Sequence, residues 1–188
     1  MKPKNDHCVP DRELTARILN GERDAFVLLI RQTEGLVAKM VFQMIGVSGD
    51  RKDLVQEIYL NAFKYLPAFR HESKLSTWIG QIAYHTCLHY IKEKKLVYLE
   101  DLPETDMYTD ENDNGKLPRE LTGILQDAVA RLPPLYRTLV TLFHQEEMSY
   151  EEIQEITDLP EGTVKNYLFR ARRALRADLL KRYNKEDL

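Results

Sequence analysis

Helical periodicity runs through most of this chain, and one long acidic stretch interrupts it; this interruption limits the possible folds more than any other feature. Residues 99–117 are rich in Asp, Glu, Asn, Pro and Thr and poor in large aliphatic side chains, so they cannot bury enough apolar surface to fold alone. On both sides of the stretch, apolar residues recur at the spacing of amphipathic helices, without the sustained alternation that is typical of strands. The sequence therefore predicts an all-α fold of two small helical domains joined by an acidic linker.

The breaks between periodic segments give approximate bounds for these parts. Before the acidic stretch, we expect helices near residues 12–20, 24–45, 52–66 and 76–95. After it, we expect helices near residues 121–131, 135–143, 150–157 and 163–182. The predicted domains are residues 11–97 and 121–183, and the predicted flexible linker is residues 98–120.

Charge is distributed unevenly along the chain, although the formal net charge is only −3. Residues 100–120 carry eight acids against two bases, whereas residues 163–185 carry eight bases against one acid. Since basic residues attract the phosphates of nucleic acids, we expect the C-terminal end to bind nucleic acid and the middle of the chain to avoid it.

The C-terminal segment has the pattern of a helix-turn-helix. Ser149 and Glu152 fit a capping box at the start of a short helix, a turn follows at 158–162, and a longer basic helix comes next. One face of the last helix is apolar, and the opposite face is basic with one aromatic residue, which suits insertion into a major groove. The residues expected to contact DNA are Thr163, Lys165, Asn166, Phe169, Arg170 and Arg173. The alternative is a charged face that is merely solvated.

The histidines and cysteines form no evident catalytic or metal-binding pattern. The residues considered were His7, Cys8, His71, His85, Cys87 and His89. His85 and His89 share a helical face, but Cys87 lies about 200° from His85 around the same helix. A two-histidine metal site completed by His71 is the remaining alternative. The two distant cysteines suit a reducing compartment, and glycine-rich phosphate loops are missing from the sequence. We therefore predict that the protein is not an enzyme and has no metal and no cofactor.

Two sets of short motifs carry a resemblance to a known family. The first set is Asp53-Leu54-Val55-Gln56-Glu57, Ala62-Phe63, Phe69-Arg70, Thr77-Trp78-Ile79 and Ile82-Ala83. The second set is Leu132-Pro133, Ser149-Tyr150-Glu151-Glu152-Ile153 and the run from Gly162 to Leu175. In this order, and separated by an acidic linker, they resemble the extracytoplasmic-function (ECF, group 4) sigma factors of the sigma-70 family. The resemblance covers roughly residues 11–180.

The resemblance implies roles for both domains. The first would bind the clamp of the β′ subunit of core RNA polymerase and melt the minus-ten promoter element, and the second would read the minus-thirty-five element. The implied polymerase-binding residues are Asp53, Gln56, Glu57, Leu60 and Lys64. The implied minus-ten residues are Phe69, Arg70, Ser73, Lys74, Trp78, Gln81, Tyr84 and His85. Leu60 lies among polar residues on its helix, and this pattern by itself fits a partner surface and a solvated face equally well.

Two departures from the family pattern leave the promoter sequence open. Tyr84 and His85 replace the Arg-Asn pair usual in the family, and Asn166-Tyr167 replaces a frequent Ser-Arg. Trp78 could be a stacking surface for an unpaired base or an anchor of the core.

Rival functions are a stand-alone helix-turn-helix regulator that binds duplex DNA as a dimer, and a helical adaptor that binds only proteins. The chain shows no sustained heptad pattern for dimerisation.

The expected partners are core polymerase, promoter DNA and an anti-sigma factor. In the free protein, the two domains would fold against each other or be held by the anti-sigma factor. Because apolar runs are short and the N-terminus is not leader-like, we expect no membrane insertion and a cytoplasmic protein that joins the nucleoid when active.

Overall fold

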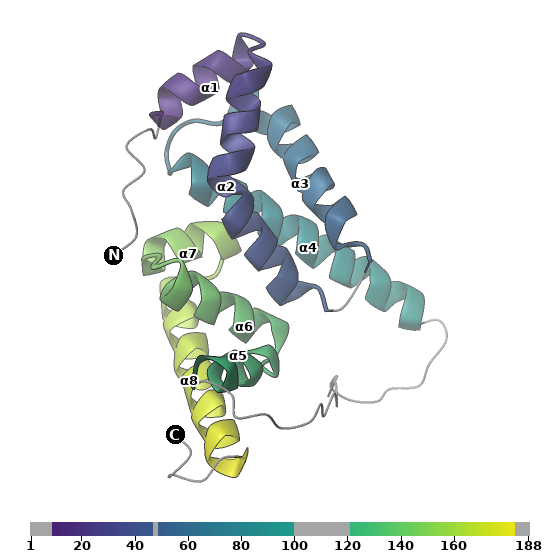
Figure 1. Cartoon of the computed structure of the whole chain (residues 1–188), viewed down its shortest axis with the longest axis vertical. Coiled ribbons are helices and arrows are strands. Elements are labelled where there is room, and N and C mark those ends of the chain that lie inside the picture. The colour runs from purple at the N-terminus through teal and green to yellow at the C-terminus, as the bar shows by residue number, and fades with distance from the viewer. Residues whose placement is uncertain (1–8, 47–48, 100–120, 183–188) are drawn as a thin grey trace.

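The computed structural model describes residues 9–46, 49–99 and 121–182, and within these residues every regular element is a helix. The helices form two groups, one at each end of the molecule (Figure 1). The first group comprises α1 (Asp11–Leu19), α2 (Arg23–Met44), α3 (Arg51–Tyr65), the 3₁₀ helix η1 (Leu66–Ala68) and α4 (Leu75–Leu99). The second comprises α5 (Leu121–Ala130), α6 (Pro134–Val140), the π-helical turn η2 (Thr141–Gln145), α7 (Tyr150–Thr157) and α8 (Glu161–Arg182). The predicted all-α class is confirmed.

The first group is built around the packing of α2, α3 and α4. Each contributes fully buried apolar side chains, among them Met40, Ile58 and Ile79. Burial of one such side chain contributes about 1.5–3 kcal/mol. The turn between α1 and α2 contains Gly21 at φ 88°, a left-handed conformation that glycine adopts at little cost.

In the second group, helix ends are marked by local signals: prolines, a capping box and a residue with a left-handed backbone. Pro133 and Pro134 open α6, where a missing backbone N–H costs nothing. The predicted capping box is present at α7: Ser149 Oγ accepts from the Glu152 amide at 3.2 Å, and a Glu152 carboxylate oxygen accepts from the Ser149 amide at 2.9 Å. Asp158 ends α7 in the left-handed region, at φ 55°.

Two predicted boundaries and the type of one predicted helix need correction. Helix α4 continues to Leu99, so residues 98 and 99 are helical, while the remainder of the predicted linker and residue 183 lie outside the described residues. Helix α8 begins two residues before Thr163, because the Pro160 carbonyl accepts hydrogen bonds from the Thr163 and Val164 amides. The segment after Pro134 changes from α-helix to π-helix at Thr141, a variation that periodicity does not reveal.

The two helical groups pack directly against each other, with α7 lying along α4 and α6 against α2 (Figure 1). Their buried apolar side chains form one continuous cluster. Of the two arrangements that the sequence left open for the free protein, the structure shows the one in which the domains fold together. Across the described ranges, none of the helices is long and apolar enough to cross a membrane.

Candidate nucleic-acid interfaces

The outer face of α8 has the composition that the sequence predicted. Val164, Leu168 and Ala171 are buried against the rest of the second group. The opposite face carries exposed basic, polar and aromatic side chains, and Thr163 is half-buried at its edge. The exposed predicted DNA contacts are Lys165, Asn166, Phe169, Arg170 and Arg173. Five of the six predicted contacts are therefore open to solvent along one side of the helix.

Lys165 forms an exchangeable ion pair, and Phe169 is largely exposed. The Lys165 ammonium pairs with Glu161 one turn earlier and lies 5.0 Å from the centre of the Tyr150 ring. Because both side chains of this pair are about half exposed, the ion pair is weak, and a phosphate can replace the carboxylate at small cost. Phe169 is 62% exposed, which is unusual for an aromatic side chain on a basic surface.

Helix α8 is held in position from both ends. Near its N-terminus, the Tyr136 and Tyr167 rings lie 5.6 Å apart and join α6 to α8. Near its C-terminus, Arg131 at the end of α5 donates to the Asp178 carboxylate at 2.6 Å. Burial alone would raise the pKa of Asp178, but hydrogen bonds from Arg131 and Arg182 outweigh it and hold the pKa below its ordinary value.

The predicted minus-ten residues gather at a hollow of about 490 Å³ between the two groups. This minus-ten hollow is lined by five of the eight predicted residues together with Ala68, Glu72, Glu155 and Asp158. The five are Phe69, Arg70, Ser73, Trp78 and Gln81. Because Glu155 and Asp158 belong to the second group, the hollow has this volume only while the two groups are packed together. The Phe69 and Trp78 rings lie 5.0 Å apart at 36° and supply aromatic surface there.

Helix α1 holds the loop that forms this hollow. The Asp11 carboxylate accepts a hydrogen bond from the Leu75 amide at 2.7 Å and so caps the start of α4 from a distant part of the chain. His71 has a left-handed backbone at φ 58°. Its ring lies 4.6 Å from that of Phe69 and 3.4 Å from the Thr15 hydroxyl, which stabilises this conformation.

The other three predicted minus-ten residues contact the second group. Lys74 pairs with Glu152 at 2.6 Å, and His85 pairs with Asp158 at 2.9 Å. Tyr84 is only 6% exposed, and burial, together with the nearby Asp158 and Tyr167, raises the pKa of its hydroxyl. In this arrangement Tyr84 is therefore not accessible to DNA, because the second group covers it.

The predicted polymerase-binding residues all lie exposed on one side of α3. They are Asp53, Gln56, Glu57, Leu60 and Lys64. Leu60 is 70% exposed, more than any other large apolar side chain in the described residues. The opposite side of α3 is buried through Ile58, Tyr59 and Ala62, as the wheel of this helix predicts.

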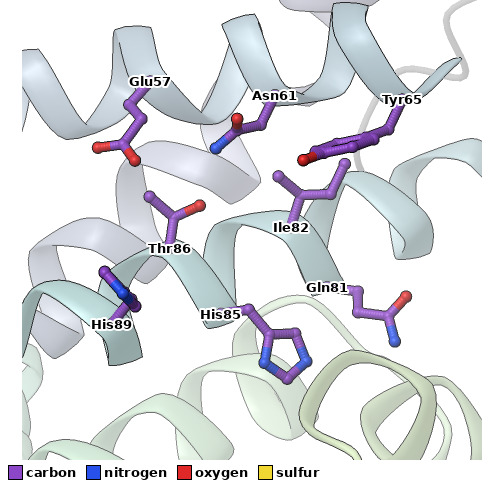
Figure 2. Close-up of a pocket in the computed structure, with 8 residues that line it drawn as sticks. All are labelled: Glu57, Asn61, Tyr65, Gln81, Ile82, His85, Thr86 and His89. Carbon is purple, nitrogen blue, oxygen red and sulfur yellow. The ribbon is translucent and has the colours of Figure 1, made fainter. Parts of the chain in front are cut away.

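A groove between α3 and α4 connects this face to the minus-ten residues. Figure 2 shows Glu57, Asn61 and Tyr65 on the α3 side, and Ile82 and Thr86 facing them from α4. Gln81 and His85 instead project from α4 away from α3. These two side chains reach Asp158 at the end of α7.

The described residues contain no group of three or more His, Cys, Asp and Glu side chains that could hold a metal ion. The alternative site completed by His71 is therefore wrong, because His71 packs against Phe69 and Thr15. Burial, with a smaller effect of Glu57, raises the pKa of the Cys87 thiol to about 12. Since the thiolate is the reactive form, Cys87 is a core residue rather than a nucleophile at neutral pH.

Comparison with known proteins agrees with this geometry. Residues 29–96 match the model of sigma-70 region 2, and residues 122–175 match that of sigma-70 region 4. The ECF RNA polymerase sigma-E factor of Haemophilus influenzae is 34% identical over 173 residues, covering 86% of this chain and 91% of that protein. The ECF RNA polymerase sigma factor SigW of Bacillus subtilis is 30% identical over 174 residues, covering 87% and 93%.

The chain belongs to the ECF sigma factors of the sigma-70 family. These proteins are non-catalytic subunits that direct RNA polymerase to specific promoters at the initiation of transcription. The resemblance stated from the sequence motifs is thus confirmed, and so is the function predicted from it.

Two solved structures share the fold. CnrH, in complex with the cytosolic domain of CnrY, has a TM-score of 0.66 at 20% identity and covers 92% of this chain and 99% of its own. The sigma factor RpoE of Bartonella quintana, in complex with the anti-sigma factor NepR, has a TM-score of 0.64 at 19% identity and covers 84% and 97%.

Sequence reasoning missed the residues that approach the minus-ten hollow from the second group. Glu152, Glu155 and Asp158 lie on or just after α7, and all three are near predicted minus-ten residues. Their spacing places them on a polar side of a short helix, which by itself is indistinguishable from a solvated face.

Proposed function

We propose that this ECF sigma factor binds its partners through three separate surfaces. The exposed side of α3 binds the clamp of the β′ subunit of core polymerase, the minus-ten hollow captures an unpaired base, and α8 reads the minus-thirty-five element. The observation that carries the proposal is the presence of an exposed basic face on α8 and an aromatic hollow on α4 in one chain. Duplex reading and single-strand capture need these two kinds of surface respectively.

The site assignments are specific to each surface. On α8, Asn166 reads a base edge, Arg170 and Arg173 contact bases or phosphates, and Lys165 contacts phosphate. In the hollow, Trp78 and Phe69 stack against a displaced base. On α3, Leu60 is the apolar centre of a rim of charged residues, an arrangement common at protein interfaces.

An anti-sigma factor is the proposed regulatory partner, and the bacterial cytoplasm the proposed location. The Bartonella neighbour with the same fold was solved with an anti-sigma factor, which supports the first proposal. The second follows from the requirement for core polymerase and promoter DNA in the same compartment.

Run-off transcription with purified bacterial core polymerase and genomic fragments tests the proposal. We expect specific transcripts only when both components are present, and their loss with Leu60→Asp or with Arg170→Ala/Arg173→Ala. Lys181→Ala controls for the loss of a single positive charge from α8, because Lys181 lies in the last turn, away from the proposed reading residues. Tight duplex binding by the protein alone, without transcripts, would instead identify the rival stand-alone regulator.

A further inference from the structure

We propose that α7 is a built-in cover of the minus-ten surface, and that its carboxylates occupy the places of the phosphates of single-stranded promoter DNA. The proposal rests on the proposed function of α4 and its preceding loop. It adds a regulatory contact within the chain, which would compete with the promoter strand for the same side chains.

The polar contacts between α4 and α7 use residues predicted to bind DNA. Lys74 pairs with Glu152 at 2.6 Å, and Gln81 donates to the Asp158 carboxylate at 3.3 Å. His85 Nε2 lies 2.9 Å from the other Asp158 carboxylate oxygen. In each pair, the first group supplies the cation or hydrogen-bond donor and the second group supplies the carboxylate. A phosphate oxygen accepts from the same donors, so α7 and the promoter strand cannot bind these side chains at once.

Another ion pair between the two groups has the same polarity, although neither of its residues lines the hollow. Lys39 on α2 pairs with Glu146, the residue that follows η2. The basic partner again belongs to the first group. The whole contact therefore resembles the neutralisation of a phosphate-binding surface by an internal anion.

An apolar contact brings α7 close enough for these pairs to form. Gly80 on α4 faces Ile156 on α7, and a Cβ atom at position 80 would lie only 3.0 Å from Ile156 Cδ1. The missing side chain at Gly80 lets the fully buried Ile156 approach the α4 backbone. Tyr84, one turn further along α4, is buried by the same approach.

The cover acts on only one of the three proposed surfaces. The polymerase-binding residues of α3 and the reading face of α8 stay exposed while α7 lies on α4. The closed protein can therefore present α3 to core polymerase before the minus-ten hollow is uncovered. The polar contacts are at least partly exposed and individually weak, so the main cost of opening is exposure of the apolar contact around Ile156 and Tyr84. Competition from a strongly binding partner or from DNA has to offset that cost.

The test removes the α7 carboxylates and leaves every proposed DNA contact intact. The triple variant Glu152→Gln/Glu155→Gln/Asp158→Asn keeps the capping box, since Gln also serves at that position, and keeps a residue at 158 that tolerates a left-handed backbone. The control, Glu13→Gln/Glu34→Gln/Glu93→Gln, removes the same formal charge from exposed positions outside the contact. The control therefore accounts for the change in net charge.

Two measurements on the full chain report opening. One is the affinity for short, labelled, mixed-sequence single-stranded DNA. The other is acrylamide quenching of the fluorescence of Trp78, which is the single tryptophan of the sequence. Trp78 lines the hollow together with Glu155 and Asp158, so its quenching reports whether α7 has moved away. Relative to the control, we expect the triple variant to bind the single strand about five- to tenfold more tightly and to be quenched more strongly. Duplex affinity should equal that of the control.

Equal single-strand affinity and equal quenching in the triple variant and the control would overturn the cover. If the triple variant loses its cooperative thermal transition, Glu146→Gln is used, which removes only the pair with Lys39 and should give about a two- to threefold gain. Run-off transcription is measured on the same preparations. If specific transcripts form but the triple variant and the control do not differ in single-strand affinity or Trp78 quenching, only the cover is overturned. If no preparation gives transcripts, the proposed function is overturned.

Discussion

The predicted DNA contacts of α8 point to solvent, whereas those of α4 and its preceding loop face a neighbouring helix of the same chain. Both surfaces carry basic and aromatic side chains, so composition does not distinguish them. The difference lies in what is packed against each one. A duplex can reach α8 without rearrangement, while a single strand can reach all of the α4 residues only after α7 moves.

The largest expected effect comes from the covered surface. Trp78→Ala should reduce open-complex formation by about tenfold or more, because stacking of one base on an aromatic ring contributes ~1–3 kcal/mol. Permanganate reactivity of unpaired thymines in the holoenzyme–promoter complex measures this, and duplex binding through α8 should not change. Trp78→Phe keeps a ring and serves as the control. Normal promoter melting by a folded Trp78→Ala variant with lowered thermal stability would make Trp78 a core anchor only.

On the open surface, Asn166→Ala should alter which promoters are chosen. A side chain that pairs with a base edge contributes about 1–3 kcal/mol of discrimination at one position, so preference there should relax about tenfold. A binding-site selection experiment with the holoenzyme measures the change position by position. An unchanged selected sequence would remove Asn166 from the base-reading residues.

Lys165→Ala on the same helix should give a smaller and uniform effect. If Lys165 contacts phosphate, its loss weakens binding to all sequences alike and lowers the slope of log affinity against log salt concentration by about one. A salt titration of duplex binding measures this slope. Should the two variants exchange behaviours, the roles assigned to Asn166 and Lys165 would be reversed.

The smallest effect is expected at Asp178, which anchors α8 rather than contacting DNA. Asp178→Asn should lower the free energy of unfolding at neutral pH by up to about 1 kcal/mol, since both partners are partly exposed. The pKa of Asp178 is depressed in the folded protein, so its contribution is present above the ordinary value of 3.8 and is lost as the pH falls through the folded value. Urea unfolding at several pH values should show wild type and variant converging in acid. A difference that persists in acid would point to packing instead.

Much of the fold was predictable because its signals are local. The capping box at Ser149, the breaks at Gly21 and Pro134, and the buried stripe of α8 each depend on residues within a few positions of one another. The exposed side of α3 followed from the same reasoning, since a helix wheel separates Ile58 from Leu60 without any tertiary information.

The state of the minus-ten residues was not predictable in this way. Periodicity shows that one face of α4 is apolar, but it does not show which element covers the remaining faces. Lys74 and Glu152 are separated by 78 positions, and nothing near either residue indicates the other. Tyr84 was expected to contact DNA, and its burial arises only because the second helical group packs against α4.

By itself, the sequence determined the helical class, the two-part organisation and the helix-turn-helix, because caps, breaks and amphipathic stripes act over one or two helical turns. The family followed from the resemblance of its short motifs. Only the tertiary structure decided that the two helical groups pack together, and therefore which DNA-binding surface is open. That choice depends on a space at Gly80 that admits Ile156 and on the Glu152 and Asp158 carboxylates, which meet Lys74 and His85 of the first group. Such complementarity exists only between surfaces that are already folded.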